Sequence, residues 1–436
     1  MNYYLLHLNL YGIKNIAEEI QLDFYNKYIT TFNPDLYRIK AIYGENGSGK
    51  TAIMTAVNIA KKVLLSPDYL KQSETQSLLR EIISKKTNEF HIQFEFAEYD
   101  DLYLSTYRYE LTISKNRGGY YDISSEKLDV ISDYTKNKKY QNVFEVVEGQ
   151  LVSLCVDENV YSMVRESTLN VLRDKPFLMA VLFGAKPDDK YLPHMFSLIY
   201  FFWSINVYLE EEDMHEMYLM SKMLENVKKS SNTQKSLEDI YTAINKQNFY
   251  IDSKGRDVVD KKNYTAYKKK VSNLESFLKV FKKNLKEITI DKRDNGDYYV
   301  CELVLDYGEY SVNREFESTG IKKLIRIYDA LVNANSGGIS FIDEMDSNIN
   351  DVYLCKLVEY FMCYSKGQMC FTTHNVDPMI VLKNNRNSID FLSTDNKVTS
   401  WKVTGNAAPE RFYRNGMIEN SPFNIDAIDF IGMFGE

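Results

Sequence analysis

The feature that most constrains this chain is the segment 44–51, GENGSGKT, which directly follows an apolar stretch at 38–43. It has the pattern GxxxxGK[ST], and apolar residues then recur at helical spacing from Ala52 to Leu65. Glycines let backbone N–H groups surround a phosphate, and the N-terminus of the next helix adds positive potential. This order predicts a phosphate-binding P-loop rather than an ordinary glycine turn. The residues predicted to bind the nucleotide are Gly44, Glu45, Asn46, Gly47, Ser48, Gly49, Lys50 and Thr51.

A P-loop that hydrolyses ATP also needs a carboxylate on a neighbouring strand. The apolar run at 339–342 ends in Asp343 and Glu344, which supplies two. We expect Lys50 to reach the β- and γ-phosphates and Thr51 and Asp343 to hold Mg²⁺. We expect Glu344 to orient and polarise the attacking water as a general base. Without the P-loop, the same pattern would fit a buried strand that ends in a solvated acidic loop.

A second short strand is predicted at 369–373, and it ends in His374. A histidine at the carboxyl end of a strand, beside a γ-phosphate, can sense that phosphate through a hydrogen bond. A lone histidine is more often structural, but its spacing after the acidic pair favours the functional interpretation. We therefore count His374 with Lys50 and Glu344 as a candidate catalytic residue.

These motifs together resemble the head of an ABC-type ATPase, as in SMC proteins and RecF. The P-loop, the acidic pair, the following Asp346 and the later His374 carry the resemblance. It implies a nucleotide-binding role for Asp346 and a signature loop just before the acidic strand, where 317–320 (ESTG) stands. It further implies that Ser318 and Gly320 contact the γ-phosphate of ATP held by a partner subunit. The LSGGQ form of transporters is not present.

The STGxKKL form at 318–324 is similar to bacterial ABC-like AAA ATPases related to the OLD family. That group includes the ATPase subunits of anti-phage systems such as PARIS (AriA) and Septu (PtuA), and the abortive-infection protein AbiL. The resemblance implies an ATP-hydrolysing sensor or scaffold subunit of an anti-phage system, with ATP and Mg²⁺ as cofactors. A RecF- or SMC-like DNA repair or chromosome-maintenance ATPase shares every catalytic residue, so that alternative stays open. A stand-alone nuclease is disfavoured because about 60 residues after His374 are too few for a usual domain.

The chain has one P-loop and one signature-like loop, and in the ABC arrangement these close on different nucleotides. The resemblance therefore implies a homodimer or higher homo-oligomer with composite sites. It also implies a separate effector protein, for which a nuclease is a candidate, and a trigger that is a nucleic acid or a phage protein. The Gln that links the metal site to the helical lobe in ABC heads is not assigned, because Gln93 lies in an alternating strand pattern typical of a surface residue.

The length of 436 residues predicts two units, or one with a large insertion. Alternating, aromatic-rich strands are predicted at 89–113, and helical spacing without strands from about 160 to 245. We therefore expect an α/β fold, an ABC-type P-loop ATPase head with a mixed sheet, an antiparallel β subdomain and a helical insertion lobe. The expected segments are 1–150 and 296–436 for the two halves of the head and 151–295 for the lobe.

A lysine-rich segment at 254–293 carries 13 Lys and Arg against five Asp and Glu, within a chain of net charge −8. Its apolar positions recur every three or four residues, which predicts an amphipathic helix. The lysine-rich face fits either a solvated surface or a contact for nucleic acid or an acidic partner. The apolar positions are Val271, Leu274, Leu278, Phe281, Leu285 and Ile288.

The cysteine pattern and the lack of a visible targeting signal favour a soluble protein in a reducing compartment. The five Cys include no CxxC pair, which favours free thiols and disfavours zinc. No signal peptide is visible, and the most apolar stretch, 195–209, is shorter than the ~20 residues of a membrane span. We expect a cytoplasmic protein with no membrane contact.

Overall fold

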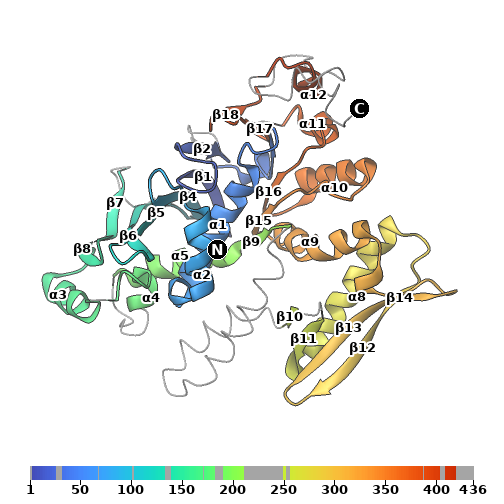
Figure 1. Cartoon of the computed structure of the whole chain (residues 1–436), viewed down its shortest axis with the longest axis horizontal. Helices are drawn as coiled ribbons and strands as arrows, with labels where there is room; N and C mark the ends of the chain where they lie inside the picture. Colours follow the sequence, from blue (N-terminus) through green and yellow to red (C-terminus); the bar gives the residue numbers. More distant parts are fainter. Residues whose placement is uncertain are drawn as a thin grey trace, which may run out of the picture. The chain divides into compact units, whose positions relative to one another are not determined.

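The computed structural model divides into two compact units (Figure 1). The first contains residues 1–207, 330–345 and 354–436, and the second contains 208–329 and 346–353. Each unit is therefore assembled from segments that are far apart in the chain. The structure describes residues 2–25, 32–66, 68–100, 103–132, 139–169, 171–181, 190–210, 249–251, 256–385, 387–402 and 408–418.

The first unit contains a six-stranded mixed sheet with the order β18-β17-β3-β16-β15-β9. Strands β17, β3, β16 and β15 run parallel to one another, and every residue in them is buried. Parallel sheets are covered on both faces, which explains why these strands consist mostly of apolar residues. The strands are β3 (Ile39–Tyr43), β9 (Ile205–Tyr208), β15 (Ile339–Ile342), β16 (Gln368–Thr372), β17 (Ile389–Leu392) and β18 (Val398–Ser400).

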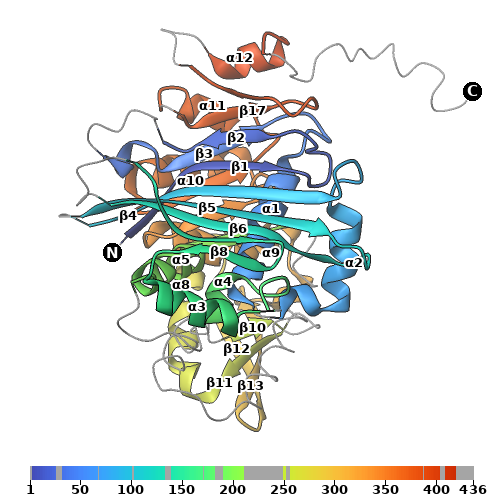
Figure 2. The same cartoon turned by 90° about the vertical axis from the view of Figure 1, so that its left-hand side faces the viewer.

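A second sheet of the same unit has seven strands in the antiparallel order β2-β1-β4-β5-β6-β7-β8, and its long central strands lie side by side in Figure 2. Burial alternates along β4 and β5, so one face packs on the core while the other is wetter. The strands are β1 (Asn2–Tyr11), β2 (Ile20–Asp23), β4 (Glu89–Tyr99), β5 (Leu104–Lys115), β6 (Tyr121–Ser132), β7 (Gln141–Val147) and β8 (Gln150–Leu154).

Aromatic side chains fill the space between this antiparallel sheet and a buried helix, α5 (Leu192–Ser204). Phe96 stacks on Phe201 with ring centroids 3.9 Å apart, and Phe94 meets Phe202 edge to face. Large aromatic rings bury the most apolar area per residue, so the high Tyr and Phe content forms core here. Among the described residues, no helix is both long and apolar enough to cross a membrane.

The other helices of the first unit surround the two sheets. Helices α9 and α10 run from one unit into the other. The helices are α1 (Lys50–Leu65), α2 (Ser73–Ile82), α3 (Glu158–Ser167), α4 (Phe177–Val181), α9 (Thr319–Asn335), α10 (Asp351–Tyr364), α11 (Asp377–Leu382), α12 (Pro409–Arg414) and the 3-10 turns η1 (Pro34–Leu36) and η2 (Tyr69–Lys71).

The second unit has a sheet of its own, with the order β10-β11-β13-β12 and β14 paired with β13. Helix α8 (Tyr264–Phe281) packs on it and buries Val271, Leu274 and Leu278. The remaining elements are β10 (Phe249–Ile251), β11 (Asp257–Asp260), β12 (Glu287–Asn295), β13 (Tyr298–Asp306), β14 (Ser311–Asn313), η3 (Lys261–Asn263) and η4 (Arg314–Phe316).

These elements correct the expected helical lobe. Strand β9 interrupts the stretch predicted to be helical, because Ile205–Tyr208 joins the central sheet. The lysine-rich segment is a helix only as far as Phe281, and Ile288 already belongs to β12. Much of the predicted helical stretch, 211–248, lies outside the described residues. The expected boundaries at 150 and 295 do not coincide with those of the two units.

The rest of the predicted pattern agrees with the structure. The strands expected at 38–43, 89–113, 339–342 and 369–373 are present as β3, as β4 and β5, as β15, and as β16. The α/β fold class, with a mixed sheet and an antiparallel β subdomain, is confirmed. The five cysteines are free thiols. The end of the C-terminal tail, 419–436, lies outside the described residues.

Candidate functional site

The P-loop joins β3 to α1 as the sequence predicts. Gly47 and Gly49 have φ angles of +79° and +108°, in the left-handed region that favours glycine. Lys50 is the first residue of α1, and its Nζ donates to the carbonyl oxygens of Gly44 and Glu45 at 2.8 and 3.0 Å. The lysine is therefore folded back along the inside of its own loop.

The loop has the features that a phosphate requires. A Cβ built on Gly47 would meet no atom within 4 Å, whereas one built on Gly44 would lie 2.3 Å from the Leu392 carbonyl oxygen. The hydroxyl of Ser48 is buried and has no hydrogen-bond partner among the described residues. The first turn of α1 has no acidic residue, so its N–H groups and dipole remain available to an anion. The residues present fit a nucleotide phosphate.

A turn near the N-terminus supports this loop from outside. Asn15 donates its side-chain N–H to the Gly47 carbonyl oxygen. A Cβ on Gly49 would lie 2.8 Å from Ile16 Cγ1, so the close approach of this turn requires glycine at that position. Nothing in the sequence pattern singles out Asn15, because a single asparagine in a turn is common.

The acidic pair follows β15 and is held by the neighbouring strand. Thr372, the last residue of β16, donates its hydroxyl to Asp343 Oδ1 at 2.7 Å. The same hydroxyl accepts the backbone N–H of Glu344 at 2.8 Å. Asp343 is only 3% exposed, so the hydrogen bond from Thr372 fixes its carboxylate at a position shielded from water.

Glu344 has an unusual backbone, with φ at +46°. Non-glycine residues in this region carry a conformational cost of about 1–3 kcal/mol, and such strain concentrates at functional sites. The bond from its N–H to Thr372 maintains the conformation. The side chain of Glu344 is half-buried.

Three parallel strands bring these groups to one edge. Ile342 pairs with Phe371, and Thr372 pairs with Ile42, so the carboxyl ends of β15, β16 and β3 meet side by side. Ligands of parallel α/β sheets bind at this edge. Asp343 and Glu344, the P-loop with its half-buried Thr51, and the exposed His374 all lie there.

The C-terminal helix α12 reaches the same region of the first unit. The Tyr413 ring stacks on Phe391 of β17 with centroids 5.5 Å apart and lies 6.1 Å from the ring of Tyr43. Burial, with a smaller contribution from the negative charge of Glu45, raises the pKa of Tyr413 to about 12. Tyr413 is therefore a neutral phenol at physiological pH.

The signature-like loop belongs to the second unit. The backbone N–H of Ser318 donates to Glu317 Oε2 at 3.0 Å, and the Tyr307 hydroxyl donates to Glu317 Oε1. Ser318 is exposed directly before α9 begins. A Cβ on Gly320 would lie 2.6 Å from the Asn348 carbonyl oxygen, so glycine is needed where the two segments meet.

A buried lysine connects three segments of the second unit. Lys323 of α9 is 2% exposed and forms an ion pair with Glu210, and its ammonium group lies 4.4 Å from the Tyr208 ring centroid. Glu210 also accepts a hydrogen bond from Ser347, which follows the half-buried Asp346. This network therefore links the helix after the signature-like loop to the segment after the acidic pair.

Gln93 lies on β4, opposite Glu110 of β5, and is half-buried. Its position supports the expectation that it is part of the sheet surface. The residues that the sequence did not reveal, Thr372, Asn15 and Lys323, are side chains that position others. Only the consecutive threonines at the end of β16 offered a signal, because a hydroxyl there can reach the neighbouring strand end.

The comparisons with known proteins identify no family for this chain. No family model matches the sequence, and no curated protein matches it. Among solved structures, an SmcHead bound to the C-winged helix domain of ScpA is 15% identical with a TM-score of 0.45, covering 92% of this chain and 98% of that one. The Pyrococcus furiosus Smc head domain with an extended coiled coil, bound to the C-terminal domain of ScpA, is 14% identical with a TM-score of 0.43, covering 92% and 97%.

The SMC head domain from Thermotoga maritima is 14% identical with a TM-score of 0.35, covering 92% of this chain and all of that one.

Proposed function

We propose that the chain binds and hydrolyses ATP as one subunit of an ABC-type assembly. The observation that carries this proposal is the sheet edge at which Asp343 and Glu344 follow β15 beside the P-loop. Thr372 holds both acidic residues through one hydroxyl, so the carboxylates are positioned before any ligand arrives. Preorganised charge at a reacting phosphate is the main means by which such enzymes work.

Some polar residues at this sheet edge bind the nucleotide and the metal, and others take part in hydrolysis. ATP with Mg²⁺ supplies the reactive phosphoanhydride bond. Lys50 would leave the carbonyl oxygens of Gly44 and Glu45 to bind the β- and γ-phosphates, and Thr51 and Asp343 would hold the metal. Mg²⁺ commonly uses one or two protein oxygens together with phosphates and water.

Glu344 accepts a proton from the attacking water, and His374 donates a hydrogen bond to the γ-phosphate. The loop residues from Gly44 to Gly49 surround the phosphates with backbone N–H groups. Ser318 and Gly320 complete the site on the nucleotide of a second copy, and Asp346 contributes there as well. A homodimer or larger homo-oligomer follows, because one chain offers each half only once.

The biological role we propose is that of a sensor or scaffold in an anti-phage, abortive-infection system. Its support is the STGxKKL form of the signature-like loop. ATP binding would hold the assembly together, and hydrolysis through Glu344 would release a separate effector. The alternative is a DNA repair or chromosome-maintenance ATPase of the RecF or SMC kind, which would use the same residues.

The decisive experiment compares Glu344→Gln with the unchanged chain and with Glu359→Gln, an exposed carboxylate in α10. Loss of the general base should slow hydrolysis by about 10²–10⁴-fold while ATP binding persists. Multi-angle light scattering with ATP and Mg²⁺ should then show a larger assembly for Glu344→Gln than without ATP. Hydrolysis at the original rate in Glu344→Gln would contradict the proposed site.

Co-purification distinguishes the two biological roles. The chain is purified with the product of the adjacent gene, and the mass of the complex is determined with and without ATP. A bound effector that leaves after hydrolysis supports the defence role. Association with a repair protein supports the alternative and leaves the ATPase site unaffected.

A further inference from the structure

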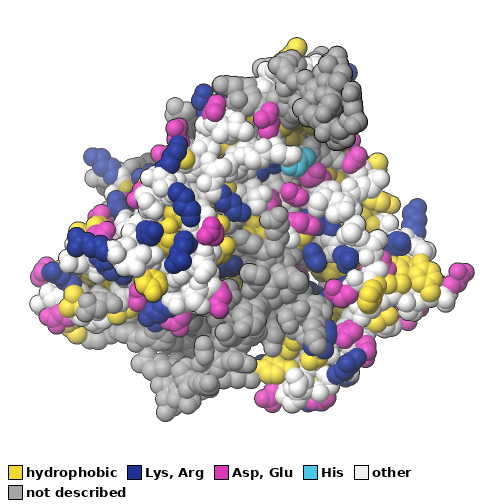
Figure 3. Space-filling view, in the orientation of Figure 1, with side chains coloured by type: hydrophobic (Ala, Val, Ile, Leu, Met, Phe, Trp, Pro, Cys, Tyr) yellow, Lys and Arg dark blue, Asp and Glu magenta, His cyan; other side chains and the backbone are white. Residues whose placement is uncertain are grey.

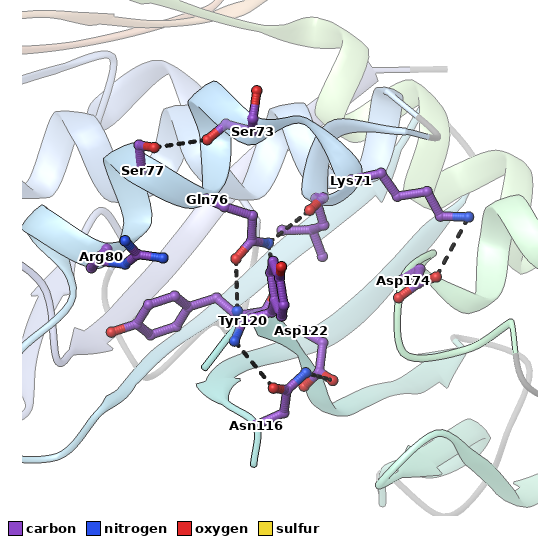
Figure 4. Close-up of a pocket in the computed structure, with 11 residues that line it drawn as sticks. Lys71, Ser73, Gln76, Ser77, Arg80, Asn116, Tyr120, Asp122 and Asp174 are labelled. Atoms are coloured by element: carbon purple, nitrogen blue, oxygen red, sulfur yellow. Dashed lines mark hydrogen bonds and ion pairs between the residues drawn. The ribbon is translucent and has the colours of Figure 1, made fainter. Parts of the chain in front are cut away.

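A polar groove lies at one end of the antiparallel sheet of the first unit, where the turn between β5 and β6 meets α2 (Figure 4). It consists of two adjoining hollows of about 510 and 660 Å³, which share Asn116, Tyr120 and Asp122. Hollows of this size accommodate small organic ligands. The groove includes none of the residues assigned to the ATP site.

The floor of the groove is rigid because its polar groups satisfy one another. Gln76 donates to the carbonyl oxygens of Leu70 and Tyr121 and accepts the Tyr121 N–H. Asn116 donates to Asp122 at 3.0 Å and accepts the N–H groups of Gly118 and Tyr120. These bonds fix the turn that carries Tyr120, so a ligand would not have to order it.

Tyr120 nevertheless presents its ring to solvent, with 61% of the residue exposed. In Figure 4 the ring lies on the same side of Gln76 as the guanidinium of Arg80, while Lys71 and Asp174 lie on the other side. The neighbouring Gly119 has open space around a built Cβ, so a flat group can approach the turn closely. An exposed aromatic ring on a fixed turn is a stacking platform.

Basic side chains outnumber acidic ones in the lining of the groove. The lining carries five basic side chains against three acidic ones, and Figure 3 shows Lys and Arg gathered on the side of the first unit that carries α2 and the antiparallel sheet. The basic residues are Lys71, Arg80, Lys115, Arg117 and Arg173, and the acidic residues are Asp122, Glu148 and Asp174.

The acidic side chains of the groove pair with only some of its basic side chains. Lys71 and Asp174 pair at 3.4 Å, but each side chain is about half exposed, and such pairs contribute little to stability. Arg173 pairs with Glu148 and Asp122. Among the described residues, no carboxylate forms an ion pair with the side chains of Arg80, Lys115 or Arg117.

We propose that this groove binds a nucleotide unit, with its base stacked on Tyr120 and its phosphates held by Arg80 and by the cations beyond the ring. Tyr120 lines both hollows, with Arg80 in the first and Lys115 and Arg117 in the second, and this arrangement suits the alternation of phosphate and base. An acidic peptide would use the cations but would leave the ring without a role. The unit comes either from a free mononucleotide or from a single-stranded nucleic acid.

Fluorescence anisotropy with two probes tests the proposal on the full chain: a labelled ten-nucleotide oligothymidylate and a fluorescent AMP derivative. Tight binding of the oligonucleotide identifies a strand as the source, and binding of the AMP derivative alone identifies a free nucleotide. Binding of neither probe overturns the proposal. The titrations are repeated with Lys50→Ala, and an equal loss of binding there would overturn it too, because the probe would then occupy the P-loop.

Variants locate the bound probe. Tyr120→Ala should weaken binding by about tenfold or more, while Tyr120→Phe keeps the stacking surface and stays within about twofold. For the oligonucleotide, Arg80→Gln should lower the slope of log affinity against log salt by about 0.7. Arg165→Gln, an exposed arginine in α3, serves as the control and should leave binding unchanged. Unchanged binding in both Tyr120→Ala and Arg80→Gln would contradict the proposal.

Discussion

The two halves of the proposed ATP site are built in opposite ways. At the P-loop edge of the first unit, Asp343 is buried and held by Thr372, and Lys50 is folded onto its own loop. At the signature-like loop of the second unit, Ser318 is exposed, and the preceding Phe316 is 84% exposed. Lys50 and Asp343 have hydrogen-bond partners within the chain, so we call the P-loop edge the inward half; Ser318 and Phe316 are exposed, so we call the signature-like loop the outward half. This difference suggests that the outward half serves a second molecule.

The largest expected effect comes from separating the two halves onto different chains. Lys50→Ala and Ser318→Ala should each reduce hydrolysis by about 100-fold or more, because each removes charge or hydrogen bonds from the transferred phosphate. An equal mixture should regain about a quarter of the original rate, since half of the random dimers then contain one intact composite site. Steady-state ATP hydrolysis at fixed total protein measures this recovery.

Ser276→Ala, an exposed serine on α8, should hydrolyse ATP at the original rate and so controls for surface substitution. If the mixture stays as inactive as its components, the two halves do not act across chains. The outward half then does not serve a second copy.

A smaller effect is expected at the hydroxyl that organises the inward half. Thr372→Val keeps the shape but removes the hydroxyl that bonds to both the Glu344 N–H and the buried Asp343 carboxylate. Urea denaturation should show a free energy of unfolding lower by about 1–3 kcal/mol. Hydrolysis should fall as well, because Glu344 is no longer held in its left-handed conformation. Thr399→Val on β18, where the side chain is exposed, should change neither quantity.

The smallest effect is expected at the outward half. Phe316→Ser should change the free energy of unfolding by less than about 0.5 kcal/mol, because the ring is mostly in solvent. ATP-dependent self-association should weaken several-fold if this ring is covered by a second copy. Sedimentation with and without ATP compares the Phe316→Ser variant with Tyr364→Ser, which changes another aromatic residue that is 70% exposed. Equal behaviour of the two variants would remove Phe316 from the interface.

The sequence predicted the local elements of the inward half, because a glycine loop between β3 and α1 and an acidic pair after β15 are local patterns. It could not predict Thr372 or Asn15, whose importance arises from neighbours that the fold brings together. The prediction of a helical lobe was wrong in part for a related reason. Leu285 and Ile288 continue the spacing of α8, yet α8 ends at Phe281 and β12 begins at Glu287. Periodicity alone does not show where a helix stops.

The sheet order also determines when the ATP site can exist during synthesis. Strand β3, which leads into the P-loop, has β16 and β17 as its neighbours, and Gln368 bonds to the backbone of Leu5 across 363 residues of chain. At about 5–20 residues per second, a ribosome needs roughly 15–70 seconds to make the residues between β3 and β16. Until then the edges of β3 have no partner. An unfinished chain therefore cannot assemble the proposed ATP site, and the emerging N-terminal half is the part most in need of a chaperone.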